Sequence, residues 1–390
     1  MRIRGAVLST LGATRPYADS RPVRTRELEL DEPGENELLV RIEAAGVCHS
    51  DLSVVSGVRP RPVPMLLGHE AAGIVERIGS GVSDVAVGER VVMSFLPRCE
   101  ACASCASQGR TPCEPGSAAN AEGRLLEGGH RLHDADHVIY HHLGVSGFAD
   151  HAVVDRRSVV PVALDVPPEV AALMGCAVLT GGGAVLNAGQ VRSGETVIVV
   201  GLGGVGMAAL LVALAHDGVR VIGVDANRDK LLLASALGAH EVFTPEDAVT
   251  AGVKGDLVVE AVGRAVAFET AINVTAPGGR TVTVGLPAPD DLATVSPLRL
   301  VAEGRTIIGS YLGSCVPARD IPIFVDLWRR GRLPVERLVS ARIGLDDLNA
   351  AFDALADGDA LRQVIVFDAP PGATTGDSHP DTSSKGRSHE

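Results

Sequence analysis

Two cysteines and a histidine with the chemistry of zinc ligands are distributed along the first half of the chain. Cys48 begins the stretch Cys-His-Ser-Asp, His69 stands in Gly-His-Glu, and Cys176 lies far downstream. Two thiolates and one imidazole leave the fourth position of a tetrahedral zinc open for water or substrate, as in catalytic zinc sites. Each of the three residues alone also fits a packed core. At this point a catalytic zinc site and ordinary core packing are both open interpretations.

A second group of cysteines is dense enough to predict a site by itself. Four of the seven cysteines fall in one short stretch, with two, two and seven residues between them. They are Cys99, Cys102, Cys105 and Cys113. Four thiolates complete a tetrahedral zinc, which predicts a structural site that ties down a loop with little core of its own. An iron–sulfur cluster is the main alternative, but the last gap departs from the three-residue gap of ferredoxin-type runs.

A glycine-rich turn lies between a β-branched run and a segment rich in Ala and Leu. The run TVIVV is followed directly by GLGGVG, and a second β-branched run ends on Asp225. Such glycines permit a tight turn, the approach of a pyrophosphate to the backbone, and close packing of strand against helix. The predicted cofactor-binding residues of the turn are Gly201, Gly203, Gly204, Val205 and Gly206.

Asp225 indicates which dinucleotide the turn would bind. A carboxylate there accepts hydrogen bonds from the adenosine ribose and repels a 2′-phosphate, so the sequence predicts NAD rather than NADP. A glycine-rich turn of an unrelated α/β protein is one alternative. A membrane span is another, because residues 196–215 carry no charge. The glycines and the strand-like start of this stretch favour a buried strand, turn and helix.

Composition limits the kind of protein and its partners. The 390 residues are 46% hydrophobic and 21% charged, which indicates a soluble globular protein of about two domains. A net charge of −13 argues against nucleic acid or a membrane as the main partner. The N-terminus lacks the apolar segment of a signal peptide, so we expect a cytoplasmic protein. In that compartment seven cysteines indicate metal binding or catalysis rather than disulfides.

The elements that must carry these residues are of two kinds. Residues 1–95 contain short strands separated by turn residues, which predicts a compact β-rich domain. Beyond the glycine-rich turn, strands are expected near residues 241–243, 257–260, 281–284 and 306–308, mostly with helices between them. This alternation predicts about six parallel strands with helices on both faces, hence an α/β domain joined to the β-rich one.

Residues 114–150 are less informative. They contain His130, His133, His137, His141 and His142 among Gly, Asp and Glu. A second metal site is conceivable, but the spacing fits no simple template. We expect a solvated, partly irregular loop.

Together these motifs resemble the zinc-dependent medium-chain alcohol dehydrogenases over nearly all of residues 1–368. The chain carries GVCHSD, GHE, the four-cysteine lobe, the later cysteine and GLGGVG in that family's order. The resemblance implies a GroES-like catalytic domain at 1–177, with a structural zinc lobe at 96–115, and a Rossmann NAD-binding domain at 178–311. Residues 312–368 are expected to return to the catalytic domain. Residues 369–390 have little apolar content and are expected to form a disordered tail.

The resemblance also implies roles for the metal-ligating residues and their neighbours. Cys48, His69 and Cys176 are implied to hold a catalytic zinc. The four-cysteine lobe is implied to hold a structural zinc, giving two zinc ions per chain. Asp51 and Glu70 are implied to be nearby carboxylates, with Asp51 fixing His69.

Proton transfer and cofactor binding follow from the same resemblance. Ser50 is implied to be the hydroxyl that takes the alcohol proton. Many relatives end this relay with a histidine three positions later, where this chain has Ser53, so water, Ser53 or His49 takes over that step. His49, Thr180 and Arg362 are further residues implied at the cofactor, with a surface ion pair as the alternative for Arg362, and Phe95 is implied at the substrate. Lys230 follows Asp225 closely and is expected either at the adenosine end of the cofactor or as a solvated charge on a helix.

The implied reaction is the reversible oxidation of a primary or secondary alcohol to an aldehyde or ketone, with hydride transfer to NAD. A long insertion before Phe148 is similar to that of glutathione-dependent formaldehyde dehydrogenases, but their arginine is replaced here by Ser117. Oxidation of another thiol adduct of formaldehyde remains an alternative. A non-catalytic NAD-binding redox sensor is an alternative of another class. The expected partners are a small alcohol or aldehyde and a second copy of the chain, as a homodimer.

Overall fold

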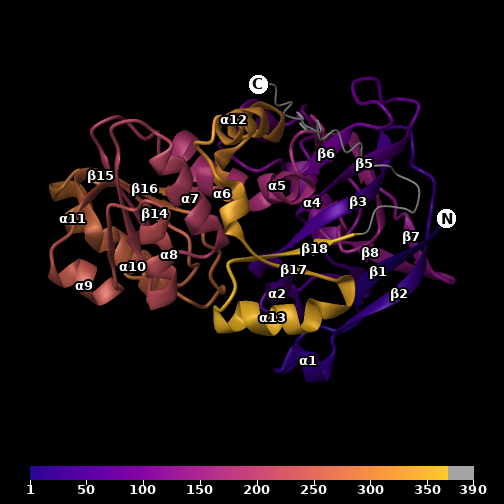
Figure 1. The fold of residues 1–390 in the computed structure, drawn as a ribbon, viewed down its shortest axis with the longest axis horizontal. Coiled ribbons are helices and arrows are strands. Elements are labelled where there is room, and N and C mark those ends of the chain that lie inside the picture. Colours follow the sequence, from indigo (N-terminus) through magenta and orange to yellow (C-terminus); the bar gives the residue numbers. More distant parts are fainter. Residues whose placement is uncertain (368–390) are drawn as a thin grey trace, which may run out of the picture.

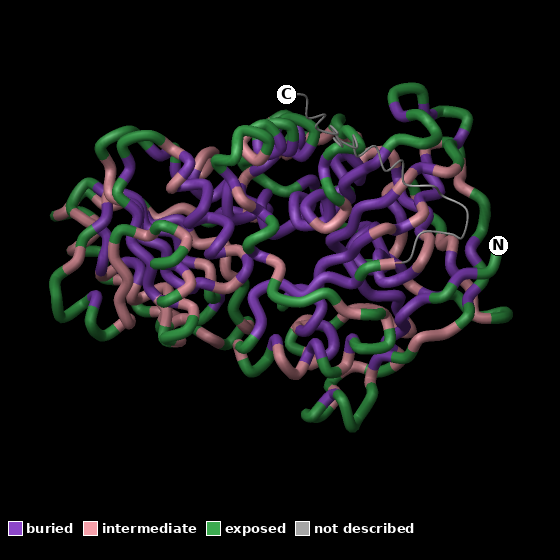
Figure 2. Tube along the Cα trace, viewed as in Figure 1, coloured by how far each residue is buried: buried purple, intermediate pink, exposed green. Residues whose placement is uncertain are grey.

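The computed structural model describes residues 1–367, so the predicted disordered tail at 369–390 lies outside the described residues. Figure 1 shows an elongated molecule with a β-rich half around the N-terminal strands and a second half built on a parallel sheet. Each half has its own buried interior (Figure 2). This architecture confirms the predicted combination of a β-rich domain with a doubly wound α/β domain.

The β-rich half contains two sheets. One is a closed barrel in the order β1-β2-β7-β8-β4, and the other has seven strands in the order β10-β6-β5-β3-β18-β17, with β9 paired to β3. Central strand β3 is buried over most of its length, and its last four residues, AAGV, are all buried. The strands are β1 (Arg2–Leu8), β2 (Val23–Leu30), β3 (Glu37–Val47), β4 (Met65–Leu66), β5 (Ala71–Ile78), β6 (Arg90–Met93), β7 (Leu132–Asp134), β8 (His137–His141), β9 (His151–Asp155), β10 (Val159–Val162), β17 (Val339–Ile343) and β18 (Arg362–Val366).

The segment at 114–150 differs from the solvated, irregular loop expected from its sequence. Glu114–Glu122 form helix α4, and β7 and β8 take part in the barrel. His141, the last residue of β8, and His142, directly after it, are buried. The prediction was wrong because only a few apolar residues, such as the buried Ile139, mark the short strands in an otherwise polar segment. The other short helices of this half are α1 (Tyr17–Ser20), α2 (His49–Val55), α3 (Ala103–Ala106) and η1 (Arg156–Ser158).

The second half is a six-stranded parallel sheet in the order β13-β12-β11-β14-β15-β16. Its strands are β11 (Thr196–Val200), β12 (Arg220–Val224), β13 (Glu241–Phe243), β14 (Gly255–Glu260), β15 (Thr275–Thr283) and β16 (Thr306–Gly309). Its helices are α7 (Gly204–Leu214), α8 (Arg228–Ala236), α9 (Pro245–Thr250), α10 (Ala265–Val274) and α11 (Pro297–Ala302). The strand order reverses at β11, and such switch points form the crevice in which α/β sheets bind ligands.

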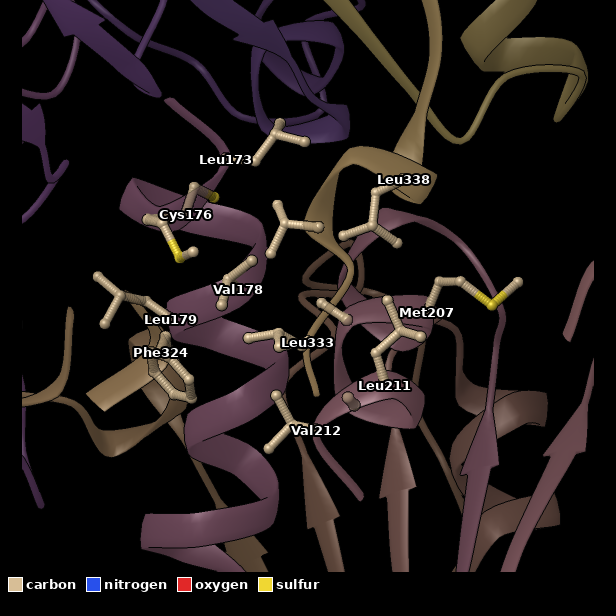
Figure 3. Packing of buried hydrophobic residues seen from close by; sticks show 14 of the residues in the cluster. Leu173, Cys176, Val178, Leu179, Met207, Leu211, Val212, Phe324, Leu333 and Leu338 are labelled. Carbon is tan, nitrogen blue, oxygen red and sulfur yellow. The ribbon is translucent and has the colours of Figure 1, made fainter. Parts of the chain in front are cut away.

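One long helical segment runs between the two halves, across the predicted boundary at residues 177 and 178. It consists of α5 (Pro168–Leu173), the π-helical turns η2 (Met174–Val178) and η3 (Ala184–Ala188), and α6 (Leu179–Gly183). By length and composition this segment could cross a membrane, but 89% of its most apolar 18-residue stretch is buried inside the protein. Figure 3 shows it packed against Met207 and Leu211 of α7 and Phe324 of α12 (Pro317–Arg329). Core packing therefore accounts for its apolar character.

After β16 the chain returns to the β-rich half through η4 (Tyr311–Ser314), α12, η5 (Val335–Leu338), β17, η6 (Leu345–Asp347) and α13 (Leu348–Asp357). Strand β18 then pairs antiparallel with β3, with Gln363 opposite Val47. This pairing brings Arg362 beside Val47, the last residue of β3, which Cys48 follows in the sequence. Residues separated by most of the chain thus meet at one point.

Candidate metal centres and cofactor site

Cys48, His69 and Cys176 converge in the buried interior although they lie far apart in sequence. Their ligand atoms lie within 4.8 Å of one another, and Cys176 Sγ is 3.4 Å from His69 Nε2. All three side chains are buried. One tetrahedral metal ion fits this triangle and keeps a fourth position open for a small molecule.

A different element positions each corner of the triangle. Strand β3 ends at Val47, so Cys48 becomes the N-cap residue of α2. His69 lies in the turn between β4 and β5. Cys176 lies in the π-helical turn η2 of the long core helix, and such turns occur frequently at functional sites.

Asp51 connects helix α2 to the His69 ring. Its Oδ2 accepts a hydrogen bond from Cys48 N at 3.0 Å, and its Oδ1 lies 2.9 Å from His69 Nδ1. Burial alone would raise the pKa of Asp51, but His69 and His142 lower it below its ordinary value. A carboxylate on Nδ1 leaves Nε2 directed toward the sulfur atoms, which is the usual arrangement for a metal-bound histidine.

His142, expected from the sequence in a solvated loop, also lies at this site. Its Nδ1 is 3.2 Å from Asp51 Oδ1, and its ring meets the His69 ring edge-on with centroids 5.5 Å apart. Among residues 1–367 neither ring nitrogen of His142 forms a hydrogen bond with good geometry, and the contact with Asp51 is close but poorly oriented. Burial lowers the pKa of His142. No spacing rule could connect it with Asp51, because the two meet only when the barrel has closed.

The interactions within the triangle shift the pKa values of its three side chains. The hydrogen bond with Cys176 lowers the pKa of Cys48 well below its ordinary value and raises that of Cys176. Burial would lower the pKa of His69, but Asp51 raises it well above the usual range. The lowered pKa of Cys48 favours negative charge at the triangle. Two thiolates with one imidazole are ligands that zinc prefers, and a bound metal ion displaces the protons of such ligands.

A buried acid and a buried base lie behind the triangle. Glu70 accepts a hydrogen bond from Ala177 N at 3.1 Å and lies 3.9 Å from Arg362 Nη1. Burial raises the pKa of Glu70 to about 7. A Cβ added to Gly204 would overlap the Arg362 side chain. Arg362 therefore lies between Glu70 and the N-terminus of α7, where it can neutralise an anion.

The polar side chains of Ser50, Ser53 and His49 in α2 have different surroundings. Ser50 Oγ lies 3.9 Å from Cys48 Sγ, beside the triangle. Ser53 Oγ instead donates to the carbonyl oxygen of His49 at 2.8 Å, one turn earlier in the same helix. Loss of water contact lowers the pKa of His49 most, Cys48 raises it, and the positive charges of Arg362 and Lys230 lower it further.

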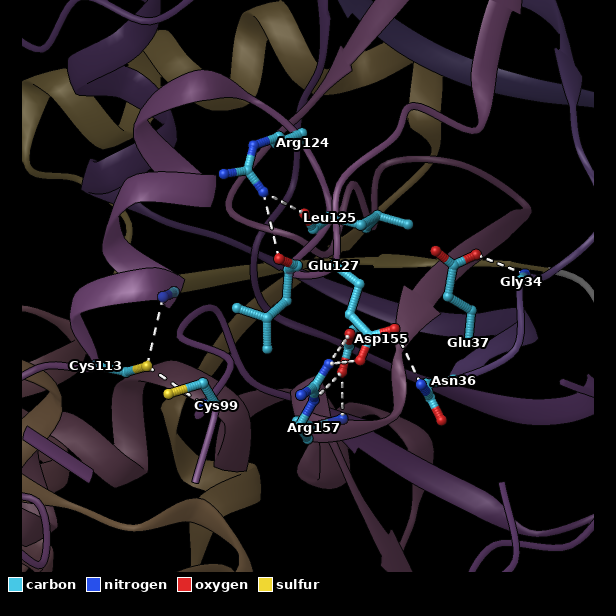
Figure 4. A network of polar contacts seen from close by, with 12 residues as sticks. Gly34, Asn36, Glu37, Cys99, Cys113, Arg124, Leu125, Glu127, Asp155 and Arg157 are labelled. Carbon is cyan, nitrogen blue, oxygen red and sulfur yellow. Dashed lines mark hydrogen bonds and ion pairs between the residues drawn. The ribbon is translucent and has the colours of Figure 1, made fainter. Parts of the chain in front are cut away.

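The four cysteines of the lobe converge as well. Their ligand atoms lie within 4.8 Å of one another. Backbone N–H groups donate to the sulfurs, from Cys99 to Cys113 at 3.3 Å (Figure 4) and from Cys105 to Cys102 at 3.4 Å. Such bonds from Cys105 and Glu114 lower the pKa of Cys102 to about 6, whereas burial raises that of Cys105 to about 12. Four cysteine sulfurs this close together are the ligand set of a four-coordinate structural zinc, which would hold them in the ionised form.

The glycine-rich turn joins β11 to α7. Gly201 has a φ of 92°, which favours glycine, and a Cβ on Gly206 would overlap the Gly201 carbonyl oxygen. Gly203 is the N-cap residue of α7, so the N–H groups of Gly204 and Val205 lie at the free helix start, where phosphates bind. The turn therefore has both the space and the donors that a pyrophosphate requires.

Asp225, at the end of β12, holds this turn in place. Its Oδ2 accepts from Leu202 N at 2.6 Å and its Oδ1 accepts from Asn227 N at 2.8 Å. Each carboxylate oxygen retains a second lone pair for a further donor. Thr180 is buried in α6, whose next residue, Gly181, packs on the backbone of α7.

Known proteins share this sequence pattern and architecture. Residues 34–164 match the family described as "Alcohol dehydrogenase GroES-like domain", and residues 204–329 match "Zinc-binding dehydrogenase". The chain belongs to the zinc-dependent medium-chain alcohol dehydrogenase family.

Individual members of this family match over almost their whole length. The chain is 36% identical to the putative alcohol dehydrogenase D of Mycobacterium tuberculosis over 362 residues, which are 90% of this chain and 98% of the relative. The benzyl alcohol dehydrogenase of Acinetobacter calcoaceticus has a TM-score of 0.86 and 30% identity, covering 94% of this chain and 100% of that one. An alcohol dehydrogenase zinc-binding domain protein of Burkholderia ambifaria has a TM-score of 0.87 and 31% identity, covering 95% and 100%.

In this member of the alcohol dehydrogenase family, the triangle has an aromatic neighbourhood. Phe95 meets His69 edge-on with ring centroids 5.5 Å apart, and meets Tyr311 at 5.8 Å. Tyr311 begins η4, where the chain leaves the parallel-sheet half. The structure thus places Phe95, the predicted substrate residue, next to His69, a predicted metal ligand. It adds Tyr311, for which the sequence carried no signal.

Proposed function

We propose that this protein catalyses the reversible oxidation of a primary or secondary alcohol to an aldehyde or ketone, with NAD as hydride acceptor. The observation that supports this best is the buried triangle of Cys48, His69 and Cys176 with Ser50 beside it. Three protein ligands leave one position open, whereas a purely structural zinc site has four. Zinc in this position supplies a Lewis acid that favours ionisation of an alcohol hydroxyl near neutral pH.

Residues of the chain prepare the alcohol for loss of hydride. Asp51 orients His69 so that Nε2 is directed toward the triangle. The Ser50 hydroxyl takes the alcohol proton and passes it on to water or His49, because the Ser53 hydroxyl is bound to the helix backbone. Phe95 and Tyr311 provide an apolar surface for the carbon skeleton and keep water away from it.

The proposed cofactor site lies where the strand order of the parallel sheet reverses, and charged groups there would hold the NAD. The N–H groups at the start of α7 and the guanidinium of Arg362 suit a pyrophosphate. Asp225 favours a ribose hydroxyl over a 2′-phosphate, which supports NAD over NADP. Lys230, in α8 after Asp225, is proposed to lie at the adenosine end. The full proposal is one NAD and two zinc ions per chain, one in the triangle and one in the lobe.

The decisive experiment is to follow formation of the reduced cofactor by absorbance, with zinc-loaded protein, NAD or NADP, and a panel of alcohols. We expect turnover of apolar alcohols without added thiol, and higher kcat/KM with NAD than with NADP. Turnover only of formaldehyde premixed with a thiol would favour the thiol-adduct reaction. A protein that binds zinc and NAD but oxidises nothing on the panel would favour a non-catalytic redox sensor.

A further inference from the structure

Two arginines without acidic partners follow helix α2. Arg59 and Arg61 flank Pro60 in the proline-rich turn before β4. Many other arginines of the chain pair with carboxylates, as Arg90 does with Glu43 at 2.7 Å. Within the described part of the chain, residues 1–367, no carboxylate forms such an ion pair with Arg59 or Arg61. These two half-buried positive charges therefore lack an ion-pair partner among the described residues.

The two arginines line a pocket between the halves of the molecule. Its volume is about 350 Å³, and its walls are Val58, Arg59, Pro60 and Arg61 from the β-rich half and Pro287 and Pro289 from the loop after β15. Arg59 Nη2 donates to the Leu286 carbonyl oxygen of that loop at 2.7 Å. Arg61 Nε is buried without a hydrogen-bond partner among the described residues. A buried, charged donor without an acceptor is costly, so an anion in the pocket would be stabilised.

Tyr311 places this pocket within electrostatic reach of the metal triangle. Burial raises the pKa of Tyr311, the charges of Arg61 and Arg59 lower it, and Cys176 raises it. The Tyr311 ring meets Phe95, which in turn meets His69. Ring contacts therefore lead from His69 through Phe95 to Tyr311, and the charges of Arg59 and Arg61 act on Tyr311.

We propose that Arg59 and Arg61 bind the carboxylate of an anionic alcohol whose hydroxyl lies at the triangle of Cys48, His69 and Cys176. This inference rests on the proposed alcohol oxidation and names its substrate class. Guanidinium groups donate paired hydrogen bonds to carboxylates, and the proline walls suit an apolar carbon chain between the two ends of the substrate. The carboxylate belongs either to a simple hydroxy acid or to the formaldehyde adduct of a thiol that carries an acid. The hydroxy acid and the thiol adduct both present a carboxylate to the arginines.

The test compares matched substrates that differ only in charge. ω-Hydroxycarboxylates of increasing chain length are assayed beside the corresponding neutral ω-hydroxyamides, with zinc-loaded protein and NAD. In a second arm, formaldehyde is premixed with mercaptopropionate or with its amide, which separates the two sources of carboxylate. The variants are Arg59→Leu, Arg61→Leu and Arg61→Lys, with Arg24→Leu as control because Arg24 is an exposed arginine of β2. Circular dichroism establishes that each variant is folded.

The readout is the ratio of kcat/KM for the carboxylate to kcat/KM for its amide. We expect wild type and the Arg24 control to favour the carboxylate, and Arg61→Leu to lower the ratio about tenfold or more, as loss of a charged hydrogen bond does. Arg61→Lys should retain most of the preference. A ratio that is unchanged in both leucine variants overturns the inference. A rise in KM for NAD with the ratio unchanged also overturns it, because the arginines then serve the cofactor.

A binding measurement keeps the inference testable if no alcohol is oxidised. Glutarate, which carries carboxylates but no hydroxyl, is titrated calorimetrically into the zinc- and NAD-loaded protein. Binding that weakens about tenfold in Arg61→Leu supports an anion site, even if the proposed reaction fails. Absence of binding, or equal binding to wild type and Arg61→Leu, overturns the inference whatever the outcome for alcohol oxidation.

Discussion

Asp51 is the residue on which the geometry of the triangle depends most. Its two oxygens meet the backbone of Cys48, the Nδ1 atom of His69 and the ring of His142. A carboxylate can only accept hydrogen bonds, so it requires the His69 proton on Nδ1 and leaves Nε2 free to bind a metal ion. An amide of the same shape removes this constraint, because it can donate to Nδ1 and favour the opposite tautomer.

For Asp51→Asn we therefore expect weaker zinc binding at the triangle, by about ten- to a hundredfold, which is the usual cost of losing the hydrogen-bond partner of a metal-bound histidine. Competition with a chromogenic chelator measures the affinity. Ser56→Ala is the matched control, because Ser56 ends the same helix and its hydroxyl donates to the Ser53 carbonyl oxygen rather than to the triangle. Equal zinc affinity in wild type and Asp51→Asn would show that Asp51 does not orient His69.

Among the elements, the cysteine lobe makes the clearest prediction. Cys113 is one of the four cysteines of the lobe. Cys315 is buried but belongs neither to the lobe nor to the triangle, and its thiol donates to the Leu179 carbonyl oxygen. For Cys113→Ser we expect the zinc content to fall by about one ion per chain and thermal unfolding to occur at lower temperature, since a structural zinc contributes folding free energy. Elemental analysis after dialysis, beside Cys315→Ser, measures this. Two ions retained by Cys113→Ser, or one lost by Cys315→Ser, would contradict a structural zinc in the lobe.

Strand β8 gives a prediction about pH. Burial lowers the pKa of His141 to about 3, and its Nε2 accepts a hydrogen bond from Arg131 N at 3.1 Å. An unfolded histidine has a pKa of about 6.5, so below that pH the unfolded chain binds a proton that the folded protein does not. His141 should therefore lower the free energy of unfolding by about 2 kcal/mol between about pH 7 and about pH 5.

The check is urea unfolding of wild type and His141→Gln at both pH values. Glutamine can still accept from Arg131 N through its side-chain oxygen but does not titrate. The loss of stability on acidification should therefore be smaller in the variant by about the same amount. Parallel losses in the two proteins would show that His141 does not remain neutral in the fold.

Elements and short motifs were predictable here, whereas contacts between distant segments were not. The β-branched runs and the glycines near Gly201 predict the parallel strands, because period and turn chemistry are local properties. Cys48, His69 and Cys176 could be grouped by ligand type and family resemblance. The position of Arg362 against the start of α7 depends on the pairing of β18 with β3, which has no local signal. The pocket of Arg59 and Arg61 likewise exists only because a loop from the other half closes over it.

At the scale of the whole molecule, the edge of the parallel sheet is exposed and apolar. Strand β16 is the last in the sheet order, so one side of its backbone has no neighbouring strand within the described part of this chain. Nearby Leu298 and Val301 of α11 are 77% and 83% exposed, and Leu292 is 82% exposed. An exposed strand edge invites pairing with another chain, and clustered exposed apolar side chains mark association surfaces.

We therefore expect a homodimer in which the β16 edges of two copies face each other, flanked by the apolar residues of α11. Light scattering after size-exclusion chromatography should give twice the chain mass for wild type and about one chain mass for Val301→Lys, because burying two unpaired ammonium groups is unfavourable. Leu232→Lys is the control, since Leu232 is 69% exposed in α8. A monomeric wild type would refute the dimer. A dimer that withstands Val301→Lys would place the interface elsewhere on the molecule.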